Sequence, residues 1–90
     1  MITLGENIKL DGFDDLEPGQ LVVIKKMVGS FAKKAAEEKG GFTSFEVYRE
    51  GTKVTVKVVK NDGTSVDSVA EEPNLFYSLS RALMDATSKL

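Results

Sequence analysis

The chain has 90 residues, a formal net charge of −2, 41% hydrophobic and 29% charged residues, and neither cysteine nor histidine. This length and composition predict a single domain covering residues 1–90. A chain that is mildly acidic overall gives poor evidence for nucleic-acid binding. Without cysteine or histidine, disulfides, the usual zinc sites and triads with a histidine base are excluded, whereas carboxylate-only Mg²⁺ or Ca²⁺ sites are not. We predict no enzyme activity, no metal, no cofactor and no small-molecule substrate.

Membrane insertion is not expected from this sequence. No apolar run approaches the roughly 20 residues that are needed to span a bilayer. The opening sequence, MITLGENIKL, lacks the basic start and the long apolar stretch of a signal peptide. We therefore expect a cytoplasmic protein.

The first half of the chain predicts a short strand and a long helix. Residues 7–10 alternate polar and apolar side chains, as a strand does. The turn-forming stretch DGFDDLEPG follows, and Pro18 suits the first turn of a helix running from about residue 19 to residue 39. The apolar stripe of this helix has a spacing of three and four residues, and it consists of Leu21, Ile24, Val28, Phe31 and Ala35.

The second half predicts three strands joined by tight turns and a final helix. The strands are expected at residues 43–50, 53–60 and 64–70, with a turn of the sequence NDG between the last two. Asn74 can cap the final helix, which runs to the end of the chain. The side chains expected on the solvent face of the sheet are Tyr48, Arg49, Lys53, Thr55, Lys57 and Val69.

These elements give the order β-α-β-β-β-α. Both helices are amphipathic and need an apolar surface to cover. We therefore predict an α+β fold, a two-layer sandwich in which both helices pack on one face of a four-stranded sheet. The other face of the sheet is left to water or to a partner.

Two acidic clusters could in principle bind a divalent cation. Asp14, Asp15 and Glu17 precede the first helix, and Glu71 and Glu72 precede the second. Neither cluster has the ligand spacing of an EF-hand, and carboxylates are favourable near helix N-termini. We interpret both clusters as charge at a helix start.

The first helix is the most basic part of the chain. Residues 20–40 contain five lysines and two glutamates. Lys26 and Lys33 lie opposite the apolar stripe and point the same way, about 10 Å apart along the helix, while Lys25 and Lys34 lie on its flanks. Such a face can bind phosphates. The alternative is a solvated face on which Glu37 and Glu38 pair with the lysines four residues earlier.

The C-terminal half resembles a known family. The sequence SVDSVAEEPNLFYSLSRAL, at 65–83, is similar to the last strand and helix of the ribosome hibernation-promoting factors, also called ribosome-associated inhibitor proteins. The matching positions are Val66, Ser68, Ala70, Glu71, Asn74, Leu75, Phe76, Ser78 and Leu79. Residues 7–11, NIKLD, resemble the first strand of that family, and the order of elements matches. The resemblance implies this fold and binding to the small ribosomal subunit through basic residues on both helices. In this chain the first helix is basic, whereas the last helix has only Arg81 and Lys89.

Two functions are therefore predicted. The first is a small non-enzymatic domain that associates with the ribosome or with structured RNA. Its phosphate contacts would be Lys25, Lys26, Lys33 and Lys34, joined by Lys53 and Lys57 if the two surfaces meet. The alternative is a protein-interaction or homodimerisation module that uses the open face of the sheet.

Overall fold

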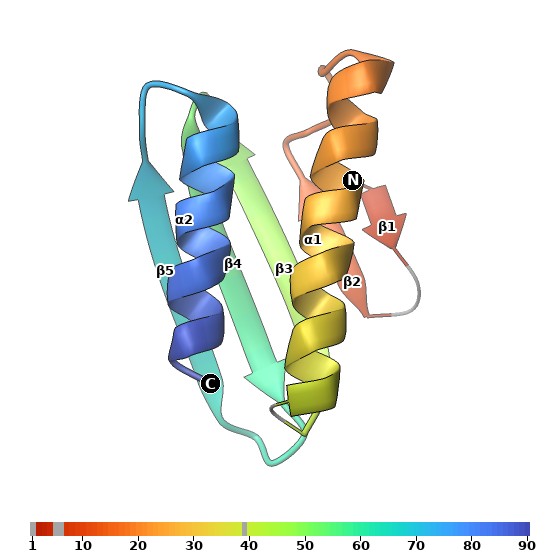
Figure 1. Cartoon of the computed structure of the whole chain (residues 1–90), viewed down its shortest axis with the longest axis vertical. Helices are drawn as coiled ribbons and strands as arrows, with labels where there is room; N and C mark the ends of the chain where they lie inside the picture. The colour runs from red at the N-terminus through yellow and green to blue at the C-terminus, as the bar shows by residue number, and fades with distance from the viewer. Residues whose placement is uncertain (1, 5–6, 39) are drawn as a thin grey trace.

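Two helices and five strands make up the described part of the computed structural model, which comprises residues 2–4, 7–38 and 40–90. In chain order the elements are β1 (Ile2–Leu4), β2 (Ile8–Asp11), α1 (Pro18–Glu38), β3 (Phe42–Glu50), β4 (Lys53–Lys60), β5 (Ser65–Glu71) and α2 (Leu75–Ser88). The strands form one sheet in this same order, in which β2 and β3 are parallel and the other neighbours are antiparallel. Both helices lie over one face of the sheet (Figure 1). The predicted α+β architecture is therefore confirmed.

The predicted number of strands was too small by one. β1 pairs antiparallel with β2, placing Ile2 opposite Leu10 and Leu4 opposite Ile8. Ile2 and Leu4 are half-buried and pack against the core. A three-residue strand shows too little alternation to be recognised from its sequence, because strand periodicity needs about four residues or more. The strand predicted at 7–10 is thus the second strand, not the first.

The connection from β2 to α1 depends on one glycine and one phenylalanine. Gly12 has a φ of +86°, and a Cβ at this position would collide with the carbonyl oxygen of Arg49 in β3. Glycine therefore lets the chain turn where two backbone segments approach closely. Phe13 is then fully buried beneath α1. The sequence predicted only a loop here, so Phe13 was missed as a core residue.

Most of the predicted apolar stripe of α1 is buried, and its members Leu21 and Phe31 are half-buried. α1 begins at Pro18, and its fully buried side chains are those of Ile24, Val28, Ala32 and Ala35. Its predicted end at residue 39 lies outside the described residues. α2 begins after Asn74, whose side-chain oxygen accepts a hydrogen bond from the Phe76 amide at 2.8 Å. This capping bond fixes the start of α2 where the sequence placed it.

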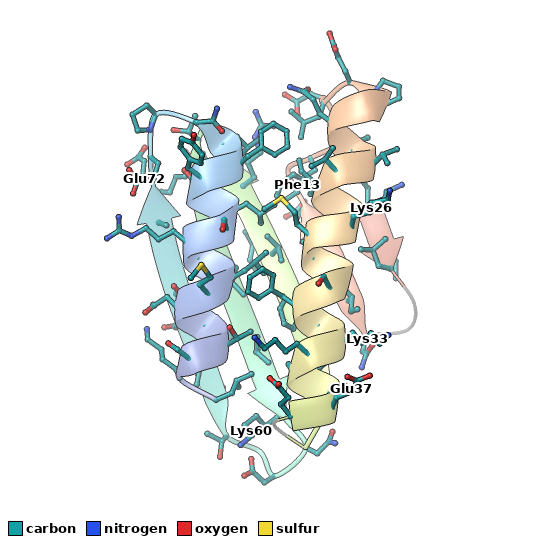
Figure 2. All side chains as sticks on the ribbon, in the orientation of Figure 1. Phe13, Lys26, Lys33, Glu37, Lys60 and Glu72 are labelled. Carbon is teal, nitrogen blue, oxygen red and sulfur yellow. The ribbon has the colours of Figure 1, made fainter. Side chains whose placement is uncertain are left out.

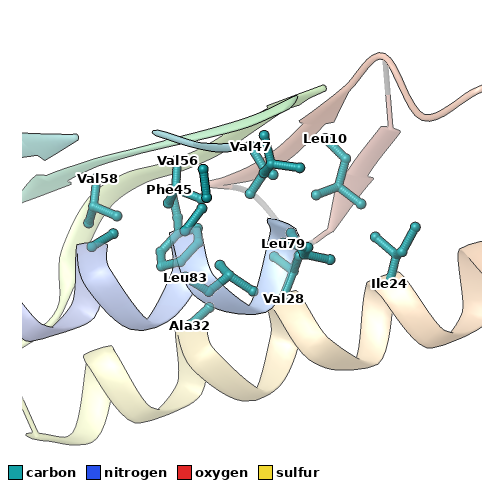
Figure 3. Packing of buried hydrophobic residues seen from close by; sticks show 14 of the residues in the cluster. Leu10, Ile24, Val28, Ala32, Phe45, Val47, Val56, Val58, Leu79 and Leu83 are labelled. Carbon is teal, nitrogen blue, oxygen red and sulfur yellow. The ribbon is translucent and has the colours of Figure 1, made fainter. Parts of the chain in front are cut away.

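The core lies between the sheet and the helices (Figure 3). β3 contributes Phe45 and Val47, and β4 contributes every second residue from Val54 to Val58, all fully buried. Burial of one such side chain contributes about 1.5–3 kcal/mol. Because side chains alternate along a strand, this burial fixes which residues of each strand face the open side of the sheet.

Candidate phosphate-binding surface

The lysines of α1 are positioned by the buried side of the helix. With Ile24, Val28 and Ala35 packed into the core, all four lysines in this helix are solvent-exposed. Lys26 and Lys33 project from the same side of α1, away from α2 (Figure 2). Two turns of helix separate them, which corresponds to about 10 Å along the axis. This geometry suits two neighbouring phosphates on one backbone.

None of these four lysines forms an ion pair with a carboxylate of the described residues. The ion pairs reported within the described ranges are Arg49–Asp15, Arg81–Glu72 and Lys89–Asp85. In this part of the chain neither Lys33 with Glu37 nor Lys34 with Glu38 forms an ion pair, so the pairing predicted for the alternative interpretation is absent. Glu37 lies on the same side of α1 as Lys33 (Figure 2). The ammonium groups of the lysines are left facing solvent.

Lys34 belongs to a different part of the surface from Lys26 and Lys33. It lines a pocket of about 310 Å³ between the C-terminal ends of α1 and α2, together with Phe31, Met84 and Thr87. Its side chain therefore borders the space beside α2, on the flank that the helical spacing predicted. The first helix thus presents an outer pair of lysines and one lysine beside the groove between the helices.

Sequence reasoning missed two apolar residues in this surface. Val22 and Val23, in the first turns of α1, are large hydrophobic side chains exposed to solvent. Val22 precedes Lys26 by one turn of helix and lies on the same face. The signal was available in the sequence, because both valines fall outside the apolar stripe. Together with Lys26 they give the outer face of α1 a mixed apolar and basic character.

Lys53 and Lys57 do not join the lysines of α1. Val54, Val56 and Val58 point toward the helices, so the intervening residues of β4 point to the opposite, open face of the sheet. The condition under which Lys53 and Lys57 were predicted to contribute, that the two surfaces meet, is therefore not fulfilled. The sheet separates the two sets of lysines.

Acidic residues flank both lysines of β4. Lys57 lies opposite Glu46 on β3 and Asp67 on β5. Lys53 lies opposite Glu50 and Glu71 in the same way. Opposite charges at facing positions stabilise a sheet by about 0.2–1 kcal/mol per pair. These neighbours also offset the attraction of either lysine for a phosphate.

Tyr48 reports the electrostatic character of the open face. Burial raises the pKa of its phenol most strongly, and the neighbouring carboxylates of Glu46 and Asp11 raise this pKa further. A phenol near negative charge resists ionisation because the phenolate would be repelled. The middle of the open face thus has negative groups beside its aromatic ring, which is unfavourable for an RNA phosphate.

Arg49 was predicted on the open face, and this prediction was wrong. Its side chain is only 16% exposed and lies on the helix side of the sheet. Nη1 donates to the Gly12 carbonyl at 2.9 Å and to Asp15 Oδ1 at 2.7 Å, and Nε donates to the Gly51 carbonyl at 2.8 Å. Arg49 follows the same alternation as Phe45 and Val47, which places it on their side. Asp15 is therefore a partner of Arg49 rather than only a charge before α1.

The two basic residues predicted for the last helix, Arg81 and Lys89, both have partners within the fold. Arg81 forms a 2.7 Å ion pair with Glu72, so the second acidic cluster also has a partner within the fold. Lys89, which follows α2, contacts Asp85 Oδ2 at 3.1 Å and donates to the Asp67 carbonyl at 2.9 Å. The basic surface implied by the family resemblance for both helices is accordingly confined to α1.

Neither metal binding nor membrane spanning has support in the described residues. Among them, no group of three or more acidic, histidine or cysteine side chains could hold a metal ion. In the same ranges, neither helix combines the length and the apolar character needed to cross a bilayer.

Comparison with known proteins supports the fold. No family model matches this sequence, and no curated protein matches it. Among solved structures, the chain is similar to the N-terminal domain of Protein Y from Thermus thermophilus, with a TM-score of 0.60 and 12% sequence identity. The match covers 93% of this chain and 94% of that one. At this identity the likeness shows the fold alone, and at that level it agrees with the family resemblance described for residues 65–83.

Proposed function

We propose that this protein is a small, non-enzymatic RNA-binding domain that associates with the ribosome, and that its first helix contacts phosphates. The observation that carries the proposal is the pair Lys26 and Lys33, exposed on one side of α1 without a carboxylate partner among the described residues. Such lysines can exchange their counterions for phosphates with little loss of internal contacts, and counterion release supplies much of the affinity for nucleic acid.

The proposed contact surface is smaller than the sequence alone suggested. Lys26 and Lys33 form its centre, and Lys25 and Lys34 flank it on α1. Lys53 and Lys57 are left out because the sheet separates them from α1 and because acids flank them. Val22 adds an exposed apolar contact beside Lys26, suited to the ribose or base of a nucleotide held at that lysine.

The likeness to other proteins supports the choice of partner. Residues 65–83 resemble ribosome-associated inhibitor proteins, and the fold that this resemblance implies is the fold observed. Fold likeness alone does not fix function, so the choice of the ribosome as partner rests on the resemblance and on the lysines of α1 together.

Co-sedimentation with ribosomes tests the proposal. The matched variants are Lys26→Gln with Lys33→Gln on α1, and Lys53→Gln with Lys57→Gln on β4. Both remove two positive charges, and glutamine avoids placing new acids beside existing ones. We expect salt-dependent co-sedimentation of the wild type, and loss of two phosphate contacts should lower the log–log salt slope by about one to two units.

The contrast between the two variants decides the outcome. The α1 variant should bind at least about tenfold more weakly, whereas the β4 variant should bind like the wild type. If the α1 variant co-sediments as well as the wild type, or if both variants lose binding equally, phosphate contact by α1 is disproved. Circular dichroism spectra of both variants verify that each is folded.

The alternative is a protein-interaction or homodimerisation module that uses the open face of the sheet. The register fills much of this face with facing lysines and acids. Two uncharged rows cross β3, β4 and β5 on this face, Tyr48, Thr55 and Val69 in one and Ser44, Val59 and Ser65 in the other, and of these six only Val69 is a large exposed apolar side chain. Light scattering at high micromolar concentration tests this alternative, because a monomeric mass would argue against a dimer on this face.

A further inference from the structure

β5 is the edge strand on the α2 side of the sheet, and one side of its backbone is unpaired by any other strand (Figure 1). The hairpin hydrogen bond from the Lys60 amide to the Thr64 carbonyl determines which residues of β5 form backbone hydrogen bonds with β4. Every second residue from Val66 onward therefore bonds to β4. The residues between them, including Asp67 and Val69, direct their N–H and C=O groups outward. The bond from Lys89 to the Asp67 carbonyl confirms this direction.

An open groove follows this unpaired edge. It has a volume of about 840 Å³, and its lining includes Val69, Tyr77, Arg81 and Met84. Tyr77 is 70% exposed and Met84 59% exposed, which makes them two of the most exposed large hydrophobic side chains in the described ranges. Tyrosine and methionine are enriched in protein–protein contacts. An edge strand with apolar side chains beside it is the surface that strand addition uses.

Two rows of charge on the open face stop at this edge. The first row runs across four strands and alternates in sign, through Lys9, Glu46, Lys57 and Asp67. The second row runs across three strands, through Glu50, Lys53 and Glu71. Both rows end on an acid of β5, and the next position outward in each is empty. A further strand with basic side chains at these two positions would continue both alternations.

We propose that β5 binds an extended peptide segment of another protein by strand addition. The segment carries Lys or Arg at two positions four residues apart, opposite Asp67 and Glu71, and uncharged residues between them. The side chain midway between the two bases faces Val69 on the open side. The two remaining side chains point to the helix side, into the groove beside Tyr77 and Met84.

β4 shows that this pattern fits β5. Its residues Lys53, Thr55 and Lys57 face Glu71, Val69 and Asp67 from the paired side, in the sequence KVTVK. The proposed segment repeats this arrangement on the unpaired side. A second copy of β5 would not, because β5 contains two acids and no basic residue, and pairing it with itself brings like charges together.

Lys89 competes with the proposed segment. Its ammonium group donates to the Asp67 carbonyl, where the backbone N–H of an added strand would donate, and Asp85 holds it there. An edge lysine of this kind also opposes unspecific strand pairing. Removing it should therefore strengthen binding of a segment with the right charges.

Fluorescence anisotropy with two labelled peptides tests the proposal. The first peptide, KVTVKVVK, has the sequence of β4. The control, EVTVEVVK, replaces the first two of its three lysines, which are four residues apart, with glutamates. We expect the first to bind the full chain at least about tenfold more tightly. The variant Asp67→Lys with Glu71→Lys should reverse this preference, and Lys89→Ala should increase affinity for KVTVKVVK about threefold or more. Equal affinity for both peptides, or no reversal in the charge-swapped variant, would overturn the proposal.

Backbone pairing requires a separate measurement. Val69→Pro removes an N–H that points away from β4, so it leaves the ladder to β4 intact and should abolish binding of KVTVKVVK. In the wild type, the peptide should slow amide exchange at Asp67 and Val69. If Val69→Pro does not fold, the exchange measurement decides in its place, and unchanged exchange rates refute strand addition. A doubling of the wild-type mass in light scattering without peptide that Val69→Pro abolishes would identify a second copy as the occupant and overturn the peptide proposal.

Discussion

Two pairs of lysines in this molecule have the same charge and opposite surroundings. Lys26 and Lys33 project from α1 into solvent, and no described carboxylate contacts them. Lys53 and Lys57 lie on β4 between acids of both neighbouring strands. The difference teaches that the number of lysines says little about a binding surface. What matters is whether the fold places opposite charge beside each lysine, and at Lys53 and Lys57 the register does so, although neither takes part in the ion pairs of the described residues.

The same contrast applies to the two arginines, and it predicts the largest effect on stability. Arg49 is mostly buried and binds Asp15 and two backbone carbonyls, whereas the side chain of Arg81 is 73% exposed and has one ion pair with Glu72. Arg49→Ala should lower the free energy of unfolding by about 2–3 kcal/mol, because it leaves the Gly12 and Gly51 carbonyls without their donor. Arg81→Ala should cost about 1 kcal/mol or less.

Urea denaturation of the two arginine variants measures this difference. A similar loss of stability in both would contradict the distinction between internal and solvent-facing charges.

Replacing one lysine of each pair with glutamate should affect stability differently in the two pairs. Lys57→Glu places a third acid between Glu46 and Asp67, so it should destabilise the fold by roughly 0.5–2 kcal/mol through two like-charge contacts. Lys33→Glu meets only Glu37 one turn later on an exposed helix face, and its cost should be about 0.5 kcal/mol or less. Thermal unfolding followed by circular dichroism ranks the two variants. A greater loss for Lys33→Glu would refute the cross-strand account.

The smallest predicted effect concerns Asp85. Its pKa is lowered from 3.8, first by the hydrogen bond that Ser68 donates and then by Lys89. A carboxyl group whose pKa is lower in the folded protein stabilises the fold. This stability is fully present above the pKa of the unfolded protein and is lost as the pH falls through the pKa of the folded protein. Below about pH 4 the melting temperature should therefore fall more steeply in the wild type than in Asp85→Asn. Parallel pH profiles of the two proteins would show that this contact contributes nothing.

Periodicity in the sequence predicted most of the elements and not the contacts between them. The alternation in KVTVKVVK gave the strand Lys53–Lys60 with its observed bounds, and Asn74 gave the start of α2. β1 was missed because three residues carry too little pattern. Arg49 was assigned to the wrong face although its own strand alternation placed it beside Val47, since a charged side chain was assumed to face water.

The candidate site was predictable in part. The exposure of the lysines of α1 followed from the apolar stripe of that helix. The separation of Lys53 and Lys57 from them followed only from which face of the sheet the helices cover. The acids beside each lysine of β4 depend on the register between strands, which a single strand sequence does not contain. The same holds for the two charge rows that end at β5.

The parallel pairing of β2 with β3 has a consequence for how the chain folds. β3, β4, β5 and α2 follow one another along the chain and pair with sequence neighbours, whereas β2 must meet β3 across the whole of α1. Contacts between distant residues form late because closing a long loop costs chain entropy. We expect the C-terminal half to assemble first. We expect the helix that carries the proposed binding lysines to be ordered last.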